Sequence, residues 1–309
     1  RYPVIRSLYW WWYALRISKR CDFLVMRHAP FDILGALASL LIPNRVSVHH
    51  SREVEELPLI RPGLLGRSLA VVERLVGGSS IRSARAVLGV TREIARYEVD
   101  RAQCPSKPHF VYPNSIVVRH TEVLQDARRP DLVEACFMCG RFSPWHGLDL
   151  LLCDASRNYQ HFAGRLRIHL IGNLSDEDRL CASGFDRLFE LHGLLDEVAF
   201  RRVLASCDIG IGSLALSRQG MSQGSTLKMC EMLAMGLPVY VGEPDVVLPP
   251  DFPFSRVTRS PSLEGILAFG EEMKSVNRAA IRNASKEYIE KARWMREAVE
   301  FLYHLRDGA

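Results

Sequence analysis

Strand-like and helix-like segments alternate along nearly the whole of this 309-residue chain. Parallel strands cannot be joined by tight turns, so a parallel sheet needs a crossover, usually a helix, between successive strands. The alternation therefore predicts an α/β fold built on doubly wound parallel sheets. Nine segments have the length and apolar content of buried strands: residues 23–27, 45–49, 86–90, 109–112, 135–139, 167–171, 187–191, 209–212 and 238–241. The predicted helices include residues 69–76, 148–154, 197–206, 226–235 and 279–303.

Length and one change in composition predict two domains. A chain of 309 residues is long enough for two α/β domains with separate cores. Pro113-Asn114 is typical of a turn after a strand, and the polar stretch 120–130 indicates a linker into a new sheet. We therefore expect a first domain over residues 1–115, a second over 116–285, and a C-terminal helix, 286–309, that packs back on the first.

The composition is that of an ordinary globular protein, with 48% hydrophobic and 24% charged residues. No apolar run reaches the roughly 18 residues of a membrane span, and no signal-peptide pattern is present, so we expect a cytoplasmic protein. Most of the eight cysteines sit in apolar runs and indicate reduced core thiols. Cys136 and Cys139 leave a redox or zinc pair open, although no second CxxC follows them.

The net charge is +5, but no basic run is interleaved with aromatic residues, which argues against nucleic acid as a partner. A basic surface also suits phosphate-bearing substrates and anionic membranes. The aromatic run 9–13 is followed by Arg16, Lys19 and Arg20, as in helices that lie on a membrane surface. The same aromatics can instead pack on a sheet, so both interpretations stay open.

A glycine-led turn, Gly140 to Gly147, follows the predicted strand 135–139. Ligands of open α/β sheets bind at the carboxyl ends of the strands. Arg141 offers a forked guanidinium to a diphosphate, and His146 is a second donor nearby. An arginine in such a turn also pairs with local carboxylates, so this element alone does not decide the function.

Three further elements follow later strands. Gly172 and Gly193 each end a strand, and a short glycine loop lets backbone approach a flat base closely. Ser225-Thr226 marks the start of a helix that Gly236 ends, and the N-terminus of a helix attracts anions. Lys228 lies in the first turn, where its positive charge is repelled by the helix dipole, and a bound phosphate would relieve this repulsion. The alternative is an ordinary surface pair between Lys228 and Glu231, three residues apart.

In this order the four elements resemble the group 1, or family 4, glycosyltransferases of the GT-B fold. That family grips the donor diphosphate with a Gly-Arg-Leu-x-x-x-Lys-Gly turn. Residues 140–147 read Gly-Arg-Phe-Ser-Pro-Trp-His-Gly, with His146 in place of the lysine. The family's Glu-x7-Glu pair falls on Gln223 and Glu231. The resemblance implies that Glu231 accepts the ribose hydroxyls, while Gln223 offers the donor sugar an amide without negative charge.

The first half of the chain is less similar to the family. Residues 112–116, Tyr-Pro-Asn-Ser-Ile, resemble its Pro-Asn-Gly-Val interdomain segment. His49 and His50 stand where the family has a histidine near the transferred sugar. The family's N-terminal domain opens with a strand and a glycine-rich loop, and about two βα units of that kind are missing before Arg1. The resemblance therefore implies a GT-B fold of two Rossmann-like domains facing across a cleft, with an incomplete N-terminal domain.

The resemblance implies transfer of a hexose from a nucleoside diphosphate sugar to a hydroxyl of a sugar or lipid-linked acceptor. It further implies retention of configuration, no metal, no cofactor besides the donor, a role in cell-surface polysaccharide or glycolipid synthesis, and peripheral contact with the inner membrane surface. The implied catalytic residues are His49, His50, Arg141 and Lys228. The implied donor-binding residues are Gly140, Arg141, His146, Gly172, Gly193, Gln223, Gly224, Ser225, Thr226 and Glu231.

Two alternatives remain open at this point. Gln223 and the short N-terminal half favour a catalytically inactive GT-B scaffold that binds a nucleotide sugar or a partner. Another GT-B enzyme, such as a sugar-nucleotide epimerase or a phosphorylase, is the third reading, although a phosphorylase normally has a far longer chain with a cofactor lysine motif.

Overall fold

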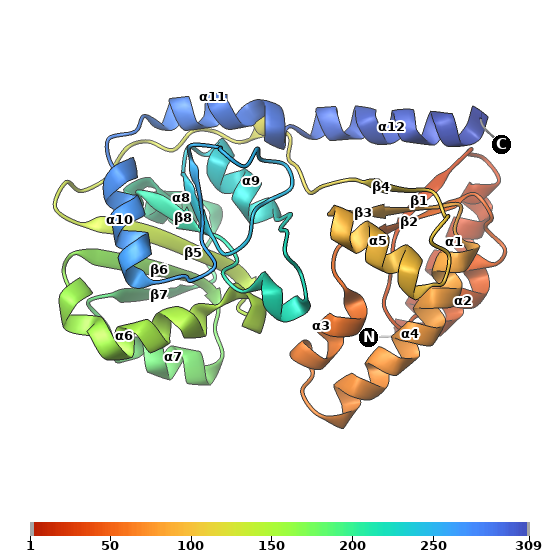
Figure 1. Cartoon of the computed structure of the whole chain (residues 1–309), viewed down its shortest axis with the longest axis horizontal. Helices are drawn as coiled ribbons and strands as arrows, with labels where there is room; N and C mark the ends of the chain where they lie inside the picture. Colours follow the sequence, from red (N-terminus) through yellow and green to blue (C-terminus); the bar gives the residue numbers. More distant parts are fainter. Residues whose placement is uncertain (1–2, 308–309) are drawn as a thin grey trace. The chain divides into compact units, whose positions relative to one another are not determined.

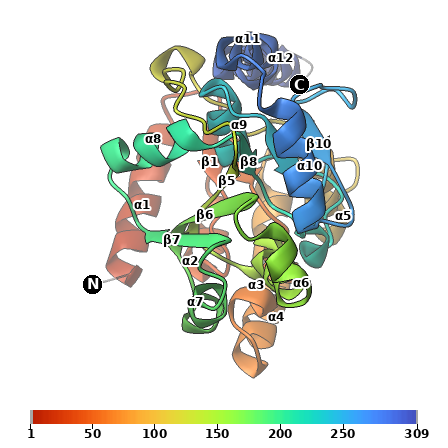
Figure 2. The same ribbon diagram turned by 90° about the vertical axis from the view of Figure 1, so that its left-hand side faces the viewer.

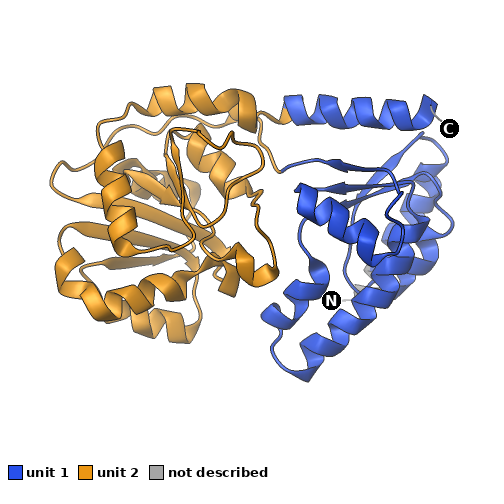
Figure 3. Cartoon of the chain, viewed as in Figure 1, with its two compact units in different colours: residues 1–113, 292–309 blue, residues 114–291 orange. Residues whose placement is uncertain are grey.

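The computed structural model describes residues 3–307, which divide into two compact units (Figure 3). Unit 1 comprises residues 1–113 and 292–309, and unit 2 comprises residues 114–291. The chain therefore leaves unit 1 after Pro113 and returns to it after Lys291, where the sequence led us to expect divisions after residues 115 and 285.

Unit 1 is built on a parallel sheet with the strand order β1-β2-β3-β4 (Figure 1). Its strands are β1 (Leu24–Arg27), β2 (Arg45–His49), β3 (Ala86–Gly89) and β4 (His109–Val111). Its helices are α1 (Pro3–Ser18), α2 (Ile33–Ser39), α3 (Glu53–Ile60), α4 (Leu64–Ser83), α5 (Arg92–Arg101) and α12 (Lys291–Asp307).

The C-terminal helix α12 covers one face of the unit 1 sheet. Val46 and Val48 of β2 alternate with polar residues, so both point to the same face. On that face Phe110 stacks on Phe301 of α12, with ring centroids 5.1 Å apart. Leu302 and Leu305 of α12 join the same apolar cluster. Burial of such side chains stabilises the association of α12 with unit 1 by about 1.5–3 kcal/mol each when it is complete.

Unit 2 is a second parallel sheet, with the strand order β10-β9-β8-β5-β6-β7 (Figure 2). Its strands are β5 (Val133–Arg141), β6 (Leu166–Asn173), β7 (Phe189–Gly193), β8 (Ile209–Ile211), β9 (Val239–Val241) and β10 (Ser255–Val257). Its α-helices are α6 (Leu148–Phe162), α7 (Asp176–Ser183), α8 (Glu197–Ser206), α9 (Leu227–Ala234), α10 (Leu263–Met273) and α11 (Arg278–Ile289). Short 3₁₀ helices are η1 (Val118–His120), η2 (Pro144–His146) and η3 (Leu216–Gln219).

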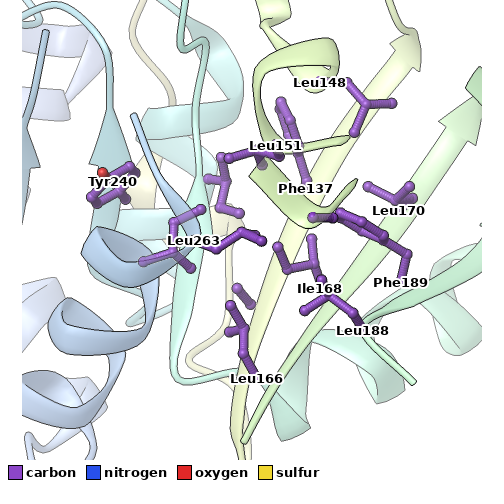
Figure 4. Packing of buried hydrophobic residues seen from close by; sticks show 14 of the residues in the cluster. Phe137, Leu148, Leu151, Leu166, Ile168, Leu170, Leu188, Phe189, Tyr240 and Leu263 are labelled. Atoms are coloured by element: carbon purple, nitrogen blue, oxygen red, sulfur yellow. The ribbon is translucent and has the colours of Figure 1, made fainter. Parts of the chain in front are cut away.

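The main core of unit 2 lies between the sheet and the helices α6, α7 and α10. Phe137, Ile168 and Phe189 project from neighbouring strands into this layer, where Leu151 of α6 and Leu263 of α10 meet them (Figure 4). All five are at most 2% exposed, so the spacing between sheet and helices is fixed by close packing. This rigid layer supports β5, β6 and β7 up to their carboxyl ends, where the register shifts between Met138 and Arg141 and between Leu170 and Ile171.

Each predicted strand is present, and the prediction of an α/β fold with two parallel sheets is confirmed. The strand order reverses, as in a doubly wound sheet, in unit 2, whereas the four described strands of unit 1 follow one another in chain order. The predicted helix 279–303 is two helices, α11 and α12, because Ile116 bonds to the backbone at the break. Ile116 donates its N–H to Ile289 O at 3.0 Å and accepts from Lys291 N at 2.8 Å. Among the helices of residues 3–307, none is long and apolar enough to span a bilayer.

All eight cysteines are free. Cys136 and Cys139 are three positions apart in β5, so their side chains point to opposite faces of the strand. Cys139 belongs to the main core, whereas Cys136 Sγ lies 3.9 Å from Met232 Sδ of α9. The two thiols therefore neither pair with each other nor hold one metal together.

Candidate functional site

The centre of the unit 2 sheet contains a topological switch point. β5 and β8 are neighbours, but the chain continues from β5 toward β6 and β7, and from β8 toward β9 and β10. This is the strand order of dinucleotide-binding folds, in which ligands occupy the crevice where the loops after the two central strands diverge. In unit 2 these loops are residues 140–147 and 212–220.

The two loops at the switch point are bonded to each other. Leu214 and Ala215 donate their backbone N–H groups to the carbonyl oxygens of His146 and Trp145, at 3.0 and 3.1 Å. Gly147 permits this contact because its φ is +76° and a Cβ there would lie 3.0 Å from Leu214 Cβ. The loop after β5 is thus held in one conformation before any ligand binds.

Arg218 pairs with Asp149, the acidic residue in the first turn of α6. Its guanidinium binds both carboxylate oxygens of Asp149, at 2.8 and 2.7 Å, and also donates to Pro144 O at 2.6 Å. Arg141 is exposed, and within residues 3–307 its guanidinium makes no hydrogen bond or ion pair. The carboxylate partner that a local ion pair requires is therefore taken by Arg218, which leaves the fork of Arg141 for a ligand.

Neighbouring strands bring further predicted residues to the same edge. Asn173 at the end of β6 pairs in register with Arg141, and Ile171 pairs with Gly193 of β7. Gly172 has a φ of +124°, and a Cβ there would lie 1.6 Å from the carbonyl oxygen of Cys139. Only glycine allows β6 to approach β5 this closely. A Cβ at Gly140 or Gly193 would instead meet nothing within 4 Å, so both backbones face open space.

Lys228, in the first turn of α9, extends to the end of β5. Its Nζ lies 3.4 Å from Cys139 Sγ and 5.5 Å from the centre of the Phe137 ring. The surface pair with Glu231 that the sequence left open is absent from the described part of the chain. Glu231 lies one helical turn beyond Lys228 and is exposed. Neighbouring parts of the fold desolvate its carboxylate in part, which raises its pKa.

His146 is a neutral hydrogen-bond donor at this end of β5. Its Nδ1 accepts the backbone N–H of Ser143 at 2.9 Å, so the remaining ring proton of the neutral form is on Nε2. Burial, together with the charge of Lys228, lowers the pKa of His146 to about 3. The position that is lysine in the resembled family thus supplies an N–H group without a full charge.

The start of α9 is tied to two other segments. Ser225 Oγ accepts the backbone N–H of Asn114 at 2.8 Å, and Asn114 Nδ2 donates to Ser225 O at 2.6 Å. Thr226 is the N-cap, and its N–H is bound by Asp245 Oδ2 at 3.1 Å. These two donor-binding candidates are therefore engaged within the fold, and the amides available to an anion are those of the first turn, beginning with Leu227.

Gln223 and Gly224 lie in the loop that leads into α9. Gln223 is half-buried, and Gly224 donates its N–H to Pro244 O at 2.8 Å. Val246 donates back to Gly224 O at 3.0 Å, so this loop runs beside the loop after β9. The two backbone hydrogen bonds of Gly224 thus hold the loop in place, and Gln223 is the residue directly before them.

The loop after β9 contains two structural carboxylates that the sequence analysis missed. Asp245 accepts from Thr226, and burial raises its pKa to about 7. Glu243 accepts the N–H groups of Leu216 and Ser217 at the start of η3, at 3.1 and 2.9 Å. Carboxylates at the starts of helices offset their unpaired amides. Two acidic residues flanking Pro244 are a weak signal in the sequence, because their helix partners are far away along the chain.

In unit 1, His49 does not reach the surface. It is fully buried, with Nε2 2.9 Å from Ser47 Oγ and Nδ1 3.2 and 3.4 Å from carboxylate oxygens of Glu98 and Glu53. Its ring stacks on His28, with centroids 4.5 Å apart. Burial lowers the pKa of His49 to about 3. His49 therefore offers no atom to a substrate, and we withdraw it from the residues proposed to touch the sugar.

The histidines of unit 1 rest on a buried ionic network centred on Arg101. Arg101 Nη2 lies 2.8 Å from Glu73, 2.7 Å from Glu98 and 4.0 Å from Glu53. Burial raises the pKa of Glu98 to about 7 and also raises that of Glu53. One guanidinium thus faces three carboxylates, and proton uptake by Glu98 and Glu53 lowers the cost of burying them. The network fixes the end of β2.

His50 follows β2 and remains partly exposed. Burial and the charge of Arg27, at the end of β1, lower its pKa to about 4. His50 is therefore neutral at physiological pH and is the histidine of the pair that keeps an accessible surface.

Two α/β units, each built on a parallel sheet, are the architecture of the GT-B class, and solved structures of that class match this chain. A lipopolysaccharide outer core galactosyltransferase, WaaB, has 11% identity and a TM-score of 0.59, over 97% of this chain and 80% of its own. HepE from Anabaena, in complex with UDP, has 14% identity and a TM-score of 0.62, over 95% and 81%. Sucrose-phosphate synthase from Thermosynechococcus elongatus has 11% identity and a TM-score of 0.65, over 96% and 77%.

At these identities the likeness establishes the GT-B fold. No protein-family model matches the sequence, and no curated protein matches it.

Proposed function

We propose that this chain is a glycosyltransferase that moves a hexose from a nucleoside diphosphate sugar to a hydroxyl acceptor. The observation that carries the proposal is the meeting of Arg141, His146 and Lys228 with the start of α9 at the end of β5. Two cations, one neutral donor and a positive helix end are a complement for a diphosphate. The similar HepE structure holds UDP, which supports this donor class.

Transfer breaks the bond between the anomeric carbon and a phosphate oxygen, and negative charge then grows on the diphosphate. Arg141 and Lys228 stabilise that charge electrostatically, and the dipole of α9 adds to it. His146 donates its Nε2–H to a phosphate oxygen without changing charge. His146 is bonded to Ser143 and Lys228 rests against Cys139, which supports a role that needs little reorganisation of these two groups. We propose that no metal is required and that configuration is retained, as the family resemblance implies.

The nucleoside and the sugar are assigned by position along α9. Glu231, one turn beyond Lys228, accepts the ribose hydroxyls, and Gln223, before the helix, binds the transferred sugar. The open backbones of Gly140 and Gly193 leave room for the flat base. Of the two histidines that the family resemblance implies to be catalytic, we keep His50 in the proposal, because His49 is enclosed.

The acceptor is proposed to be a sugar or a lipid-linked sugar of cell-surface polysaccharide or glycolipid synthesis, used by a cytoplasmic enzyme at the inner membrane surface. Helix α1 supports this with exposed aromatics, since Trp10 and Trp12 are 57% and 47% exposed. Arg16 lies over the Trp12 ring at 4.4 Å, and aromatic and basic side chains together favour a membrane interface. Trp10→Ser with Trp12→Ser should reduce sedimentation with anionic phospholipid vesicles severalfold. Equal sedimentation of variant and parent would remove the membrane from the proposal.

Calorimetric titration with UDP, GDP and ADP tests the donor site. We expect one of these nucleotides to bind the parent chain, and Arg141→Ala to weaken it by about tenfold or more. The matched control is Arg157→Ala, which removes the same charge from an exposed position three turns along α6. Two outcomes contradict the donor site. Either none of the three nucleotides binds the parent chain, or Arg141→Ala binds them as tightly as the control.

A catalytically inactive scaffold is the second candidate, and two observations favour it. His146 and Gln223 are neutral where the resembled family has charged residues, and burial keeps His146 neutral at physiological pH. A scaffold binds the nucleotide sugar but neither hydrolyses nor transfers it. Overnight incubation with the tightest-binding nucleotide sugar, followed by detection of released nucleoside diphosphate, separates the two candidates.

A further inference from the structure

Three side chains on β6 and β7 bring metal-ligating atoms together outside the proposed donor site. His169 Nδ1 lies 3.0 Å from His192 Nε2. The Glu190 carboxylate sits beside both, with Oε2 3.7 Å from His169 Nδ1 and Oε1 3.6 Å from His192 Nε2. His169 pairs in register with Glu190, so these two side chains share one face of the sheet. His192 lies at the register shift between Leu191 and Gly193, and its contact with His169 brings its ring to the same face.

The protonation of this cluster is set from the neighbouring strand. His169 Nε2 lies 3.3 Å from Glu134 Oε1 of β5, and both side chains are buried. A carboxylate only accepts, so His169 Nε2 carries the proton of the neutral ring and Nδ1 presents its lone pair to His192. A histidine that donates one nitrogen to a carboxylate while the other holds a metal is the usual arrangement of protein metal sites.

The distances also fit a small divalent cation. Bonds of about 2.0–2.1 Å from a tetrahedral zinc ion place its ligand atoms roughly 3.3–3.4 Å apart. The two histidine nitrogens are 3.0 Å apart, and each lies 3.6 to 3.7 Å from the nearer oxygen of Glu190. One ligand atom from each residue lies within 4.8 Å of the other two, so rotation of the exposed Glu190 side chain brings the set toward that value. Glu190 is 46% exposed and His192 is 14% exposed, which leaves an approach from solvent and a fourth position for water.

We propose that His169, Glu190 and His192 form a binding site for a divalent transition-metal ion of the zinc class. In the metal-free chain the proton on His192 Nε2 lies between the two rings. On binding it moves to His192 Nδ1, so that the neutral ring presents the lone pair of Nε2 to the ion. Arg167 is the competing cation, because its Nη1 lies 3.5 Å from Glu190 Oε2. Arg167 is partly exposed and is free to swing away.

The ion would join β6 to the edge strand β7 at the residue before Gly193. It would therefore stabilise unit 2 by mass action and hold the end of β7 in place. A second group of candidate ligands, His49, Glu53 and Glu98, is less suited to an ion because Arg101 already supplies a cation there.

Titration of the full chain with Zn²⁺ and Co²⁺, after chelator treatment and in a non-chelating reductant, tests the site. We expect one ion to bind with micromolar or tighter affinity, and His192→Ala to weaken binding at least tenfold. Glu134→Gln keeps all three ligands, and we expect it to weaken binding about tenfold through His169. His161→Ala, which removes a 56% exposed histidine elsewhere in unit 2, is the matched control and should bind like the parent.

The spectrum of the Co²⁺ complex identifies the ligands independently of stability. Nitrogen and oxygen ligands give visible absorption without the near-ultraviolet band of cobalt–thiolate bonds. The proposal is overturned if His192→Ala binds Zn²⁺ as tightly as the parent, if the Co²⁺ complex shows a thiolate band, or if the parent binds neither ion.

Discussion

Lys228 Nζ lies 3.4 Å from Cys139 Sγ, so a cation in the first turn of α9 rests against a buried thiol at the end of β5. A cation at the N-terminus of a helix opposes the helix dipole. The thiol does not offset this, because burial raises the pKa of Cys139 and keeps it uncharged at neutral pH. Lys228 is thus placed where a bound anion relieves an existing repulsion.

Replacing Lys228 by methionine should weaken nucleoside diphosphate binding while leaving the fold intact. A charge-assisted bond to phosphate contributes about 1.5–3 kcal/mol, which corresponds to a loss of roughly tenfold or more. The melting temperature without ligand should stay the same or rise, since the repulsion with the helix dipole is removed. Calorimetry and thermal unfolding measure the two effects, with Lys286→Met on the exposed face of α11 as control. Unchanged affinity would exclude Lys228 from the phosphate site.

Gly172→Ala should destabilise unit 2 strongly. Its φ of +124° is unfavourable for alanine, and the new Cβ would lie 1.6 Å from Cys139 O, so β5 and β6 must move apart. We expect a loss of more than about 3 kcal/mol in urea unfolding. Gly140→Ala is the matched control, because a Cβ there meets nothing within 4 Å, and it should cost far less. Similar losses for both variants would contradict the close approach of the strands.

Asp245 should make the stability of the chain fall as pH rises. An unfolded aspartate titrates near 3.9, and burial raises the pKa of Asp245 to about 7 in the folded chain. The contribution of protonated Asp245 to the free energy of unfolding is fully present below about pH 4 and is lost as the pH rises through 7. Asp245→Asn stays neutral and keeps an acceptor for Thr226. Relative to the parent, its stability should improve by roughly 2 kcal/mol between pH 5 and pH 8. A pH-independent difference between the two chains would show that Asp245 titrates normally.

Gln223→Glu tests whether the chain is an active enzyme with a weakened donor site. The carboxylate restores the charge pattern of the resembled family next to the transferred sugar. If transfer limits the parent, turnover should rise severalfold with little change in the affinity for the nucleoside diphosphate alone. Gln160→Glu, on the exposed face of α6, controls for added negative charge. Zero turnover in both the parent and Gln223→Glu would favour the scaffold.

Local patterns predicted the parts of the fold that depend on neighbours in sequence. Apolar runs located the strands, and the glycine stop at Gly236 matches a residue with φ of +84° just after α9. The strand β10 was missed because Ser255–Val257 is short and mostly exposed at the sheet edge. The break between α11 and α12 was missed because Ile116, far away in the sequence, causes it.

In the candidate site, too, the sequence predicted what depends on neighbouring residues and missed what depends on distant ones. Arg141, Lys228 and Gly172 follow from their places after strands or at a helix start, and the structure puts them at one edge. The burial of His49 does not follow from sequence, since the partners that enclose it, Glu53 and Glu98, come from later helices. Asp245 was missed for a related reason, because its partner Thr226 lies on another loop.

The proposal that a nucleoside diphosphate binds at the switch point of unit 2 can be tested by hydrogen–deuterium exchange with a saturating nucleoside diphosphate. The ligand should slow amide exchange in residues 140–147, around Gly193 and in the first turn of α9, with no comparable change in α6 or α10. Protection at these three segments together would locate the ligand at the switch point of unit 2. Protection elsewhere, or none at a concentration that saturates calorimetric binding, would contradict the account.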